Sequence, residues 1–463
     1  MQIGKQRFGQ GLIVDAVAAF AQAVHITPSR VEGWVNLSSS QLAAGNFESA
    51  VTAASKAIDL NPKLMVAHMM LGDALRETNR WEEALSAYLL AVKLERSPPA
   101  LNRLACALRA RSQPLKAEAL YLEAINSAPQ FTLAKVNLAT LNAELHRVEQ
   151  AKEQLEKLST IELPGAERQE VNTTLALLKE QIRLQPGLTE LLNQNNTEPL
   201  LELLKAVPEE LQDTDAPVLQ TIKRYKAPAL KINGTSDQCP LALPADWPMI
   251  EALFMIPVID TVDDYLAIQR ALELGEPAST DLLESLNMEP AIRAARMSQQ
   301  AMLDPILAEC QLRLWHALAC ADIPGLYPGH FKYTQNKTRA NRERKPAEPI
   351  KTAGTVRSYI TDIYPNLPAG LPRGLASWMA ISDIHAFADG NGRIALTWLN
   401  RELEWAGETP VIFNRDDGIG GEISATANEA RSHGGDISRL LPVIRRAQAR
   451  TVQFCEELNN KRL

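Results

Sequence analysis

Small and large apolar residues recur along the first third of the chain with a period of about 34 residues. One series of alanines has spacings of 34, 34, 33 and 34, at Ala16, Ala50, Ala84, Ala117 and Ala151. A second series follows seven residues later, at Ala23, Ala57, Ala91 and Ala124. Between the two series come mostly larger side chains, at Phe20, Ala54, Tyr88, Tyr121 and Leu155. Small residues let two helices approach closely and large ones fill the space between them, so the period predicts stacked helix pairs.

Prolines mark the ends of several of these units, at Pro28, Pro62 and Pro129. The pattern resembles the tetratricopeptide repeat, and the resemblance covers residues 1–160. Counting back from Ala16 places Met1 at the fifth position of its repeat, so we expect the chain to begin inside a helix. The resemblance implies a groove that binds a protein partner; the alternative is a spacer that only orients the rest of the chain.

The pattern is weaker in residues 161–245, which we interpret as a helical and irregular linker region. Helices are expected over Ala166–Leu184 and Glu198–Val207, separated by Pro186-Gly187 and an Asn-rich turn at residues 193–196. Residues 216–244 mix proline, glycine and lysine and are typical of a linker.

Helical periodicity returns after Trp247. It predicts helices over Ser279–Met288, Ile292–Met302, Pro305–Ala319, Pro372–Ile384, Arg393–Trp405 and Gly435–Leu458. The whole chain is therefore expected to be all-α.

Composition narrows the class of protein further. With 463 residues, of which 46% are hydrophobic and 22% charged, the chain has the composition of soluble globular domains. It contains no apolar run of membrane-spanning length and no recognisable secretory signal. Five scattered cysteines without a CxxC pair indicate reduced thiols in the cytoplasm, not disulfides or a zinc site. The net charge of -7 argues against nucleic-acid binding.

The chemistry concentrates in residues 385–393, HAFADGNGR, which join two predicted helices. A Gly-Asn-Gly turn that opens a helix can direct several backbone N–H groups at an anion such as phosphate. Asp389 could hold Mg2+ beside phosphate oxygens, and Arg393 could bind phosphate through paired hydrogen bonds. His385 could act as a general base, because histidine titrates near neutral pH. Each residue taken singly is also compatible with ordinary turn chemistry.

This segment resembles the signature of Fic domains, H-P-F-x-D/E-G-N-G-R-x-x-R. The flanking residues are similar as well: FKYTQN at 331–336 resembles the start of the family's target-docking flap, and Asn400 matches a recurrent asparagine. Asn428 occupies a place where the family often has an asparagine near the nucleobase. The resemblance implies that residues 246–463 form a helical Fic domain with a small β-hairpin flap.

The resemblance also implies a protein adenylyltransferase, a nucleotidyltransferase that moves AMP from ATP to a Ser, Thr or Tyr hydroxyl of a target protein. His385 would then deprotonate the target hydroxyl, Asp389 would bind Mg2+, and Arg393 would hold the leaving phosphates. Phe387 would anchor the loop in the core. The anion hole would consist of Gly390, Asn391 and Gly392. Repeats and flap would bind the target, with an acidic segment docking on the basic run at residues 337–345.

Three departures from the family pattern bear on these expectations. Ala386 replaces a proline, Leu396 replaces a second arginine that contacts the γ-phosphate, and residues 414–426 lack a tyrosine typical of adenine-binding members. Another donor, such as UTP or a choline-bearing nucleotide, is therefore an alternative to ATP. Residues 285–289, SLNME, resemble an inhibitory helix motif in which Glu289 would be the inhibitory residue.

Two further alternatives remain open. The chain could be an adaptor in which the repeats bind partners and the Fic domain is inactive. Its oligomeric state is also open, with a homodimer as one alternative.

Overall fold

The computed structural model describes residues 1–194, 196–225, 242–256, 258–321, 327–332, 346–418 and 421–462. Within these ranges the regular elements are all helical, as the sequence predicts, and no strand occurs among them. The predicted β-hairpin flap begins with FKYTQN at 331–336, of which the structure describes residues 331 and 332; residues 333–345, which include the basic run, lie outside the described residues. None of the helices in these ranges is long and apolar enough to cross a membrane.

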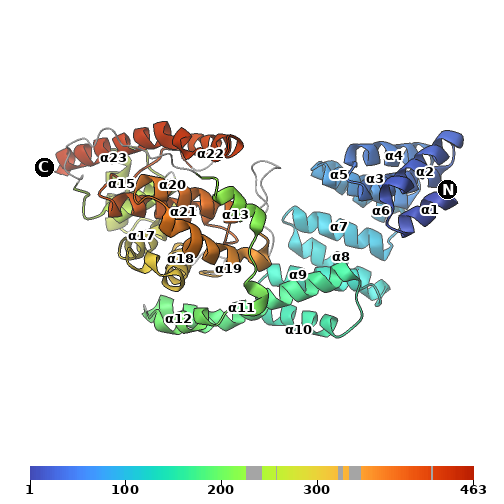
Figure 1. Ribbon diagram of the computed structural model, residues 1–463, viewed down its shortest axis with the longest axis horizontal. Helices are drawn as coiled ribbons and strands as arrows, with labels where there is room; N and C mark the ends of the chain where they lie inside the picture. Colours follow the sequence, from blue (N-terminus) through green and yellow to red (C-terminus); the bar gives the residue numbers. More distant parts are fainter. Residues whose placement is uncertain are drawn as a thin grey trace. The chain divides into compact units, whose positions relative to one another are not determined.

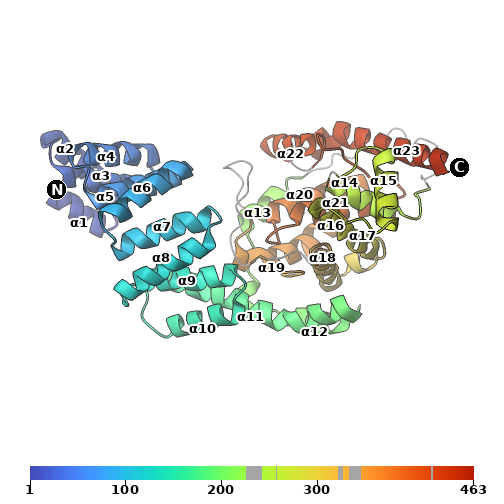
Figure 2. The same cartoon turned by 180° about the vertical axis from the view of Figure 1, so that it is seen from behind.

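The chain divides into two compact units, Met1–Asn172 and Thr173–Leu463. The first consists of successive helix pairs, which follow one another in Figures 1 and 2. Its helices are α1 (Gln2–Gly9), α2 (Ile13–Ile26), α3 (Val31–Ala43), α4 (Phe47–Leu60), α5 (Met65–Glu77), α6 (Trp81–Leu94), α7 (Pro98–Ala110), α8 (Pro114–Ser127), α9 (Thr132–Glu144) and α10 (Val148–Ser159). A longer helix, α11 (Gly165–Gln194), begins in the first unit and continues into the second.

The recurring small residues pack as the period predicts. All five alanines of the first series are fully buried, and so are three of the four in the second series. Gly72 on α5 faces Tyr88 on α6 so closely that a Cβ atom there would lie 2.5 Å from the ring. Gly4 on α1 and Phe20 on α2 make the same contact in the first helix pair, where a Cβ atom at Gly4 would lie 2.6 Å from the ring. A small residue on one helix therefore accommodates a ring from the next.

The turn inside each helix pair has a left-handed residue at one fixed position. Positive φ angles occur at Gly11, Gly45, Asn79, Ser112 and His146, which are spaced like the alanines. Polar contacts also join neighbouring repeats, including Arg103 with Asp73 at 2.9 Å and Asn137 with Asn102 at 2.8 Å. Backbone and side chains thus follow the same period as the apolar pattern.

The second unit is a helical domain. After the end of α11 it contains α12 (Glu198–Lys205), α13 (Ala216–Ile222), α14 (Trp247–Met255), α15 (Val262–Glu273), α16 (Thr280–Leu286), α17 (Met288–Arg296), α18 (Pro305–Ala319), α19 (Pro349–Ser358), α20 (Leu371–Ile384), α21 (Asn391–Trp405), α22 (Glu422–Ser432) and α23 (Leu441–Arg462). Short 3-10 turns lie at Glu209–Leu211, Ala301–Leu303, Tyr364–Asn366 and Ile437–Leu440, and a π-helical turn lies at Tyr359–Ile363.

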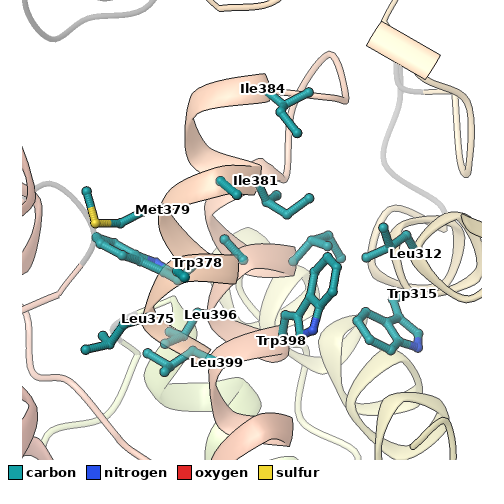
Figure 3. Packing of buried hydrophobic residues seen from close by; sticks show 14 of the residues in the cluster. Leu312, Trp315, Leu375, Trp378, Met379, Ile381, Ile384, Leu396, Trp398 and Leu399 are labelled. Atoms are coloured by element: carbon teal, nitrogen blue, oxygen red, sulfur yellow. The ribbon is translucent and has the colours of Figure 1, made fainter. Parts of the chain in front are cut away.

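Helices α20 and α21 lie at the centre of this unit and supply much of its core. Trp398 on α21 is fully buried and meets Trp315 of α18 edge to face, with ring centroids 6.3 Å apart. Figure 3 shows this pair beside the apolar side chains of α20. Leu396 is also buried among these core residues. The loop between the two helices is thereby supported by a rigid apolar base.

The predicted helix bounds hold for α18 and α20 to within one residue, but one predicted break is wrong. The helix α11 continues through Pro186-Gly187. Gly187 packs against the backbone of Leu200, where a Cβ atom would lie 2.8 Å from Cα. Buried leucines on both sides hold the helix together despite the hydrogen bond that proline removes. Tertiary packing here outweighs local chain preference.

Candidate functional site

His385 lies at the C-terminal end of α20, where the predicted loop begins. His385 ends the helix in the left-handed conformation, with φ 52° and ψ 59°. For a residue with a Cβ atom this conformation costs about 1–3 kcal/mol, so its surroundings must hold it. The Nδ1 atom lies 3.3 Å from the carbonyl oxygen of Ser382. A carbonyl oxygen only accepts hydrogen bonds, so Nδ1 carries the proton and Nε2 carries the lone pair of the neutral ring.

The other end of the loop opens α21. Gly390 precedes the helix with φ +75°, a conformation that suits glycine. Asn391 is buried and closes the loop, because its amide accepts from the N–H of Phe387 at 2.9 Å and donates to the Phe387 carbonyl at 2.8 Å. The first-turn N–H groups of α21 have no intrahelical acceptor, which gives this end an affinity for anions.

His316 of α18 packs against the loop between α20 and α21. Its ring stacks on Phe387 with centroids 3.9 Å apart, and both side chains are buried. The N–H of Gly329 donates to Nδ1 at 3.0 Å, so Nε2 carries the proton and donates to the Asp389 carbonyl at 3.2 Å. Burial lowers the pKa of His316 to about 3 and keeps the ring neutral.

Arg393 lies in the first turn of α21, beside the loop. Its guanidinium is largely buried, and Nη1 has no hydrogen-bond partner among the described residues. Two carboxylates are near: Glu284 of α16 at 3.7 Å from Nη1 and Asp389 at 3.9 Å from Nη2. A buried N–H donor without a hydrogen bond lowers the stability of the folded chain. An anionic ligand that binds this guanidinium would supply the acceptor that Nη1 lacks.

The structure links Asn428 of α22 to the end of α20. Arg431 donates from Nη1 to the Asn428 side-chain oxygen at 2.8 Å and from Nε to Asp383 at 2.9 Å. Tyr225 donates a hydrogen bond to the same carboxylate. Burial raises the pKa of Asp383 to about 7, although Arg431 opposes that rise. Because arginine has no acceptor, the Asn428 oxygen must face it, and the NH2 group points away from the guanidinium.

Two other predicted residues lie apart from the loop chemistry. Glu289 pairs with Arg293 on its own helix, at 2.6 Å, and Glu284 is the glutamate near Arg393. Asn400 is fully buried and exchanges hydrogen bonds with the backbone of Val411 at 2.8 and 3.0 Å. Its amide also donates to Glu251 at 2.9 Å, which indicates a structural role.

The residues present fit a magnesium ion only in part. Asp389 is an exposed carboxylate, with 69% of its side-chain surface accessible, and oxygen is the ligand that Mg2+ prefers. No group of three or more acidic, histidine or cysteine side chains able to hold a metal occurs in the described part of the chain. Asp389 could therefore bind Mg2+ together with phosphate oxygens and water, as in sites where the nucleotide supplies ligands.

Four residues near the loop could not be predicted from the sequence motif of the loop itself. Lys332, His316 and Glu284 come from other segments, and a single residue of these types carries no signal of its own. Arg431, three residues after Asn428, has a helical spacing that could have indicated a contact with it. Lys332 belongs to the FKYTQN segment, whose resemblance to a family pattern was the one signal for it.

A comparison with known families matches the first unit. Residues 2–64 and 35–100 match the family model described as tetratricopeptide repeat. Similar solved structures include a thermophilic TPR protein of Thermus thermophilus, with 20% identity and a TM-score of 0.34 over 39% of this chain and 96% of that one. Another is PilF of Pseudomonas aeruginosa, with 17% identity and a TM-score of 0.35 over 44% of this chain and 94% of that one.

The prediction of tetratricopeptide repeats is thus confirmed for residues 2–100. The helix pairs α7–α8 and α9–α10 continue the same packing, with buried alanines at the repeat positions. Because the identities and TM-scores of the solved structures are low, this assignment rests on the family model and the helix pairs. The matched residues all lie in the first unit.

Proposed function

We propose that the second unit transfers a nucleoside monophosphate, with AMP from ATP as the leading donor, to a hydroxyl group of a protein. The loop from His385 to Arg393 carries this proposal, because it brings a candidate base, a helix N-terminus and a buried guanidinium together in nine residues. Its resemblance to the Fic signature supports the same reaction. Buried side chains fix both ends of the loop, as a preorganised site requires.

The proposed reaction gives each of these groups a role. Nε2 of His385 takes the proton of a Ser, Thr or Tyr hydroxyl while its oxygen attacks the α-phosphorus of the nucleotide. A new P–O bond forms, the bond to the β-phosphate oxygen breaks, and pyrophosphate leaves. The first-turn N–H groups of α21 and the Arg393 guanidinium neutralise charge on the phosphate oxygens.

The same proposal assigns Mg2+ to Asp389. A Mg2+ ion held by Asp389 would withdraw charge from the phosphate oxygens. The exposed carboxylate supports this assignment, since it leaves room for phosphate and water as further ligands.

The repeats support a second element of the proposal, recruitment of a protein. Tetratricopeptide repeats stack into extended surfaces suited to protein binding. We propose that they bind the target of the transferase. An adaptor role with an inactive second unit is the rival proposal, and the family match to the repeats is compatible with it.

A panel of labelled nucleotides tests the proposal. The chain is incubated with Mg2+ and each nucleoside triphosphate labelled in the base or the α-phosphate, and label on protein is measured. We expect label from at least one donor, and its loss in His385→Ala, because removal of a general base costs about 10²–10⁴ in rate. His25→Ala, an exposed histidine of the first unit, is the matched control and should keep full labelling. Labelling that persists in His385→Ala would reject the mechanism.

A further inference from the structure

One lysine bonds to the backbone on both sides of His385. The backbone N–H of Lys332 donates to the Ala386 carbonyl at 2.8 Å, and its ammonium donates to the Ile384 carbonyl at 3.2 Å. These two carbonyls belong to the residues directly before and after His385. The segment that carries Lys332 is fixed by its neighbour Phe331, whose ring lies 5.3 Å from Phe387 and under the Arg313 guanidinium.

The position of this ammonium is unusual for a lysine. Lys332 is only 1% exposed, and a buried charge is costly unless polar groups compensate it. The carbonyl end of α20 provides such compensation, since the C-terminal end of a helix carries partial negative charge. Packing alone does not require a charge here, because an apolar side chain of similar length would fill the same space.

The backbone between the two carbonyls has the conformation that needs support. His385 is left-handed, and this backbone conformation sets the direction of its Cβ atom and therefore the region that its imidazole can reach. Lys332 gives the Ile384 carbonyl a charge-assisted hydrogen bond, which is stronger than the 3.3 Å bond that the N–H of Ala347 donates to the same oxygen. With the weaker bond alone, His385 could relax toward a commoner conformation and turn its ring away from the start of α21.

We propose that Lys332 is a positioning residue that clamps His385 in its left-handed conformation and so aims Nε2 at the reacting hydroxyl. This inference rests on the proposed transferase function. It assigns Lys332 no contact with the nucleotide, and it separates the placement of the base from the binding of phosphate by Arg393 and α21.

The test compares two substitutions at this position. Lys332→Met keeps the stem and removes the ammonium, and Lys332→Arg keeps a donor and a charge. For Lys332→Met we expect kcat to fall about 10–100-fold, since a small displacement of a reacting group has effects of this size. The KM for the nucleotide should change less than about twofold. Lys332→Arg should recover part of kcat. The matched control is Lys351→Met, a partly exposed lysine on α19 that pairs with Glu348 and should behave like the unaltered chain.

Thermal stability distinguishes positioning from a purely structural role. The Ile384 carbonyl keeps a second donor, the N–H of Ala347 at 3.3 Å, so Lys332→Met leaves it paired. Replacing a buried charge with an apolar side chain is often neutral or stabilising. We therefore expect an unchanged or higher Tm together with the lower kcat. A lower Tm with kcat unchanged at a temperature where the variant is folded would overturn the clamp.

A second readout needs no activity. The imidazole resonance of His385 in a histidine-labelled sample is assigned from its absence in His385→Asn. Lys332→Met should shift or broaden this resonance, whereas Lys351→Met should leave it unchanged. If the unaltered chain transfers no nucleotide, the proposed function fails while this measurement still decides on the clamp. An unchanged His385 resonance in Lys332→Met would reject the clamp even in an active enzyme.

Discussion

The buried side chain of His316 supports the loop, and it also makes the stability of the folded chain depend on pH. Burial lowers its pKa to about 3, and His330 beside it is lowered to about 3 for the same reason. The unfolded chain binds a proton at each ring below about pH 6.5, but the folded chain does not until near pH 3. Each ring therefore favours unfolding as the pH falls through this window.

The first prediction follows from that difference. Between pH 6.5 and pH 5 the free energy of unfolding should drop by about 2 kcal/mol for each of these histidines. Urea unfolding at the two pH values measures the drop. His316→Gln can still donate to the Asp389 carbonyl but has no proton to gain, so this variant should show a smaller pH dependence. An equal drop in both proteins would contradict the assignment.

Leu396 gives a second prediction at the scale of one residue. It takes the place of an arginine in the family pattern, yet the structure buries it to 5% exposure in the core. Leu396→Arg would place a guanidinium among apolar side chains, so we expect a loss of several kcal/mol of stability. Leu396→Met, the control, should cost less than about 1.5 kcal/mol. Thermal unfolding compares the two, and an unchanged Tm for Leu396→Arg would show that this position reaches solvent.

At the scale of the element, the sequence predicts helices well where packing agrees with local preference. The helix Pro305–Ala319 has the same bounds in sequence and structure, with Asp304 capping its first N–H groups. The helix break predicted at Pro186-Gly187 is wrong, because Gly187 packs against Leu200 of the next helix and this contact stabilises the continuous helix. The local residue pattern gives no sign of this contact. Helix α23 starts at Leu441 and not Gly435, which has a positive φ of 85°.

The candidate site also has a part that the sequence predicts and a part that it does not. The residues of the loop itself, from His385 to Arg393, follow from a contiguous motif with known chemistry. Its supports do not, because His316 and Lys332 reach the loop from segments more than 50 residues away. No local periodicity encodes such contacts, and only the folded core brings them together.

The turns of the helix pairs give a prediction of their own. Ser112 adopts φ 56° where the first two pairs have glycine, at Gly11 and Gly45. Ser112→Gly removes the strain of a left-handed side chain and should raise stability, by up to about 1 kcal/mol. Gly45→Ala should lower it by a similar amount. Thermal unfolding of both variants checks the pair, and the same sign of change in both would contradict a common turn geometry.

At the scale of the whole molecule, the two units suggest separate tasks. The matched repeats lie in the first unit, and the loop with its described supports lies in the second unit. Removing residues 1–160, which precede α11, should leave basal self-modification and reduce modification of the physiological target. Transfer rates to both acceptors measure the effect. Equal target modification with and without the repeats would mean that the array is a spacer.

The proposed function requires that a nucleoside monophosphate, and not a phosphate group alone, moves to a hydroxyl. The most direct test incubates the chain and Mg2+ with ATP labelled in either the α- or the γ-phosphate. We predict that protein acquires label from α-labelled ATP only, and that His385→Ala acquires none. Label from γ-labelled ATP would identify a phosphotransferase, and the absence of label from α-labelled ATP or any other α-labelled donor would contradict the proposed activity.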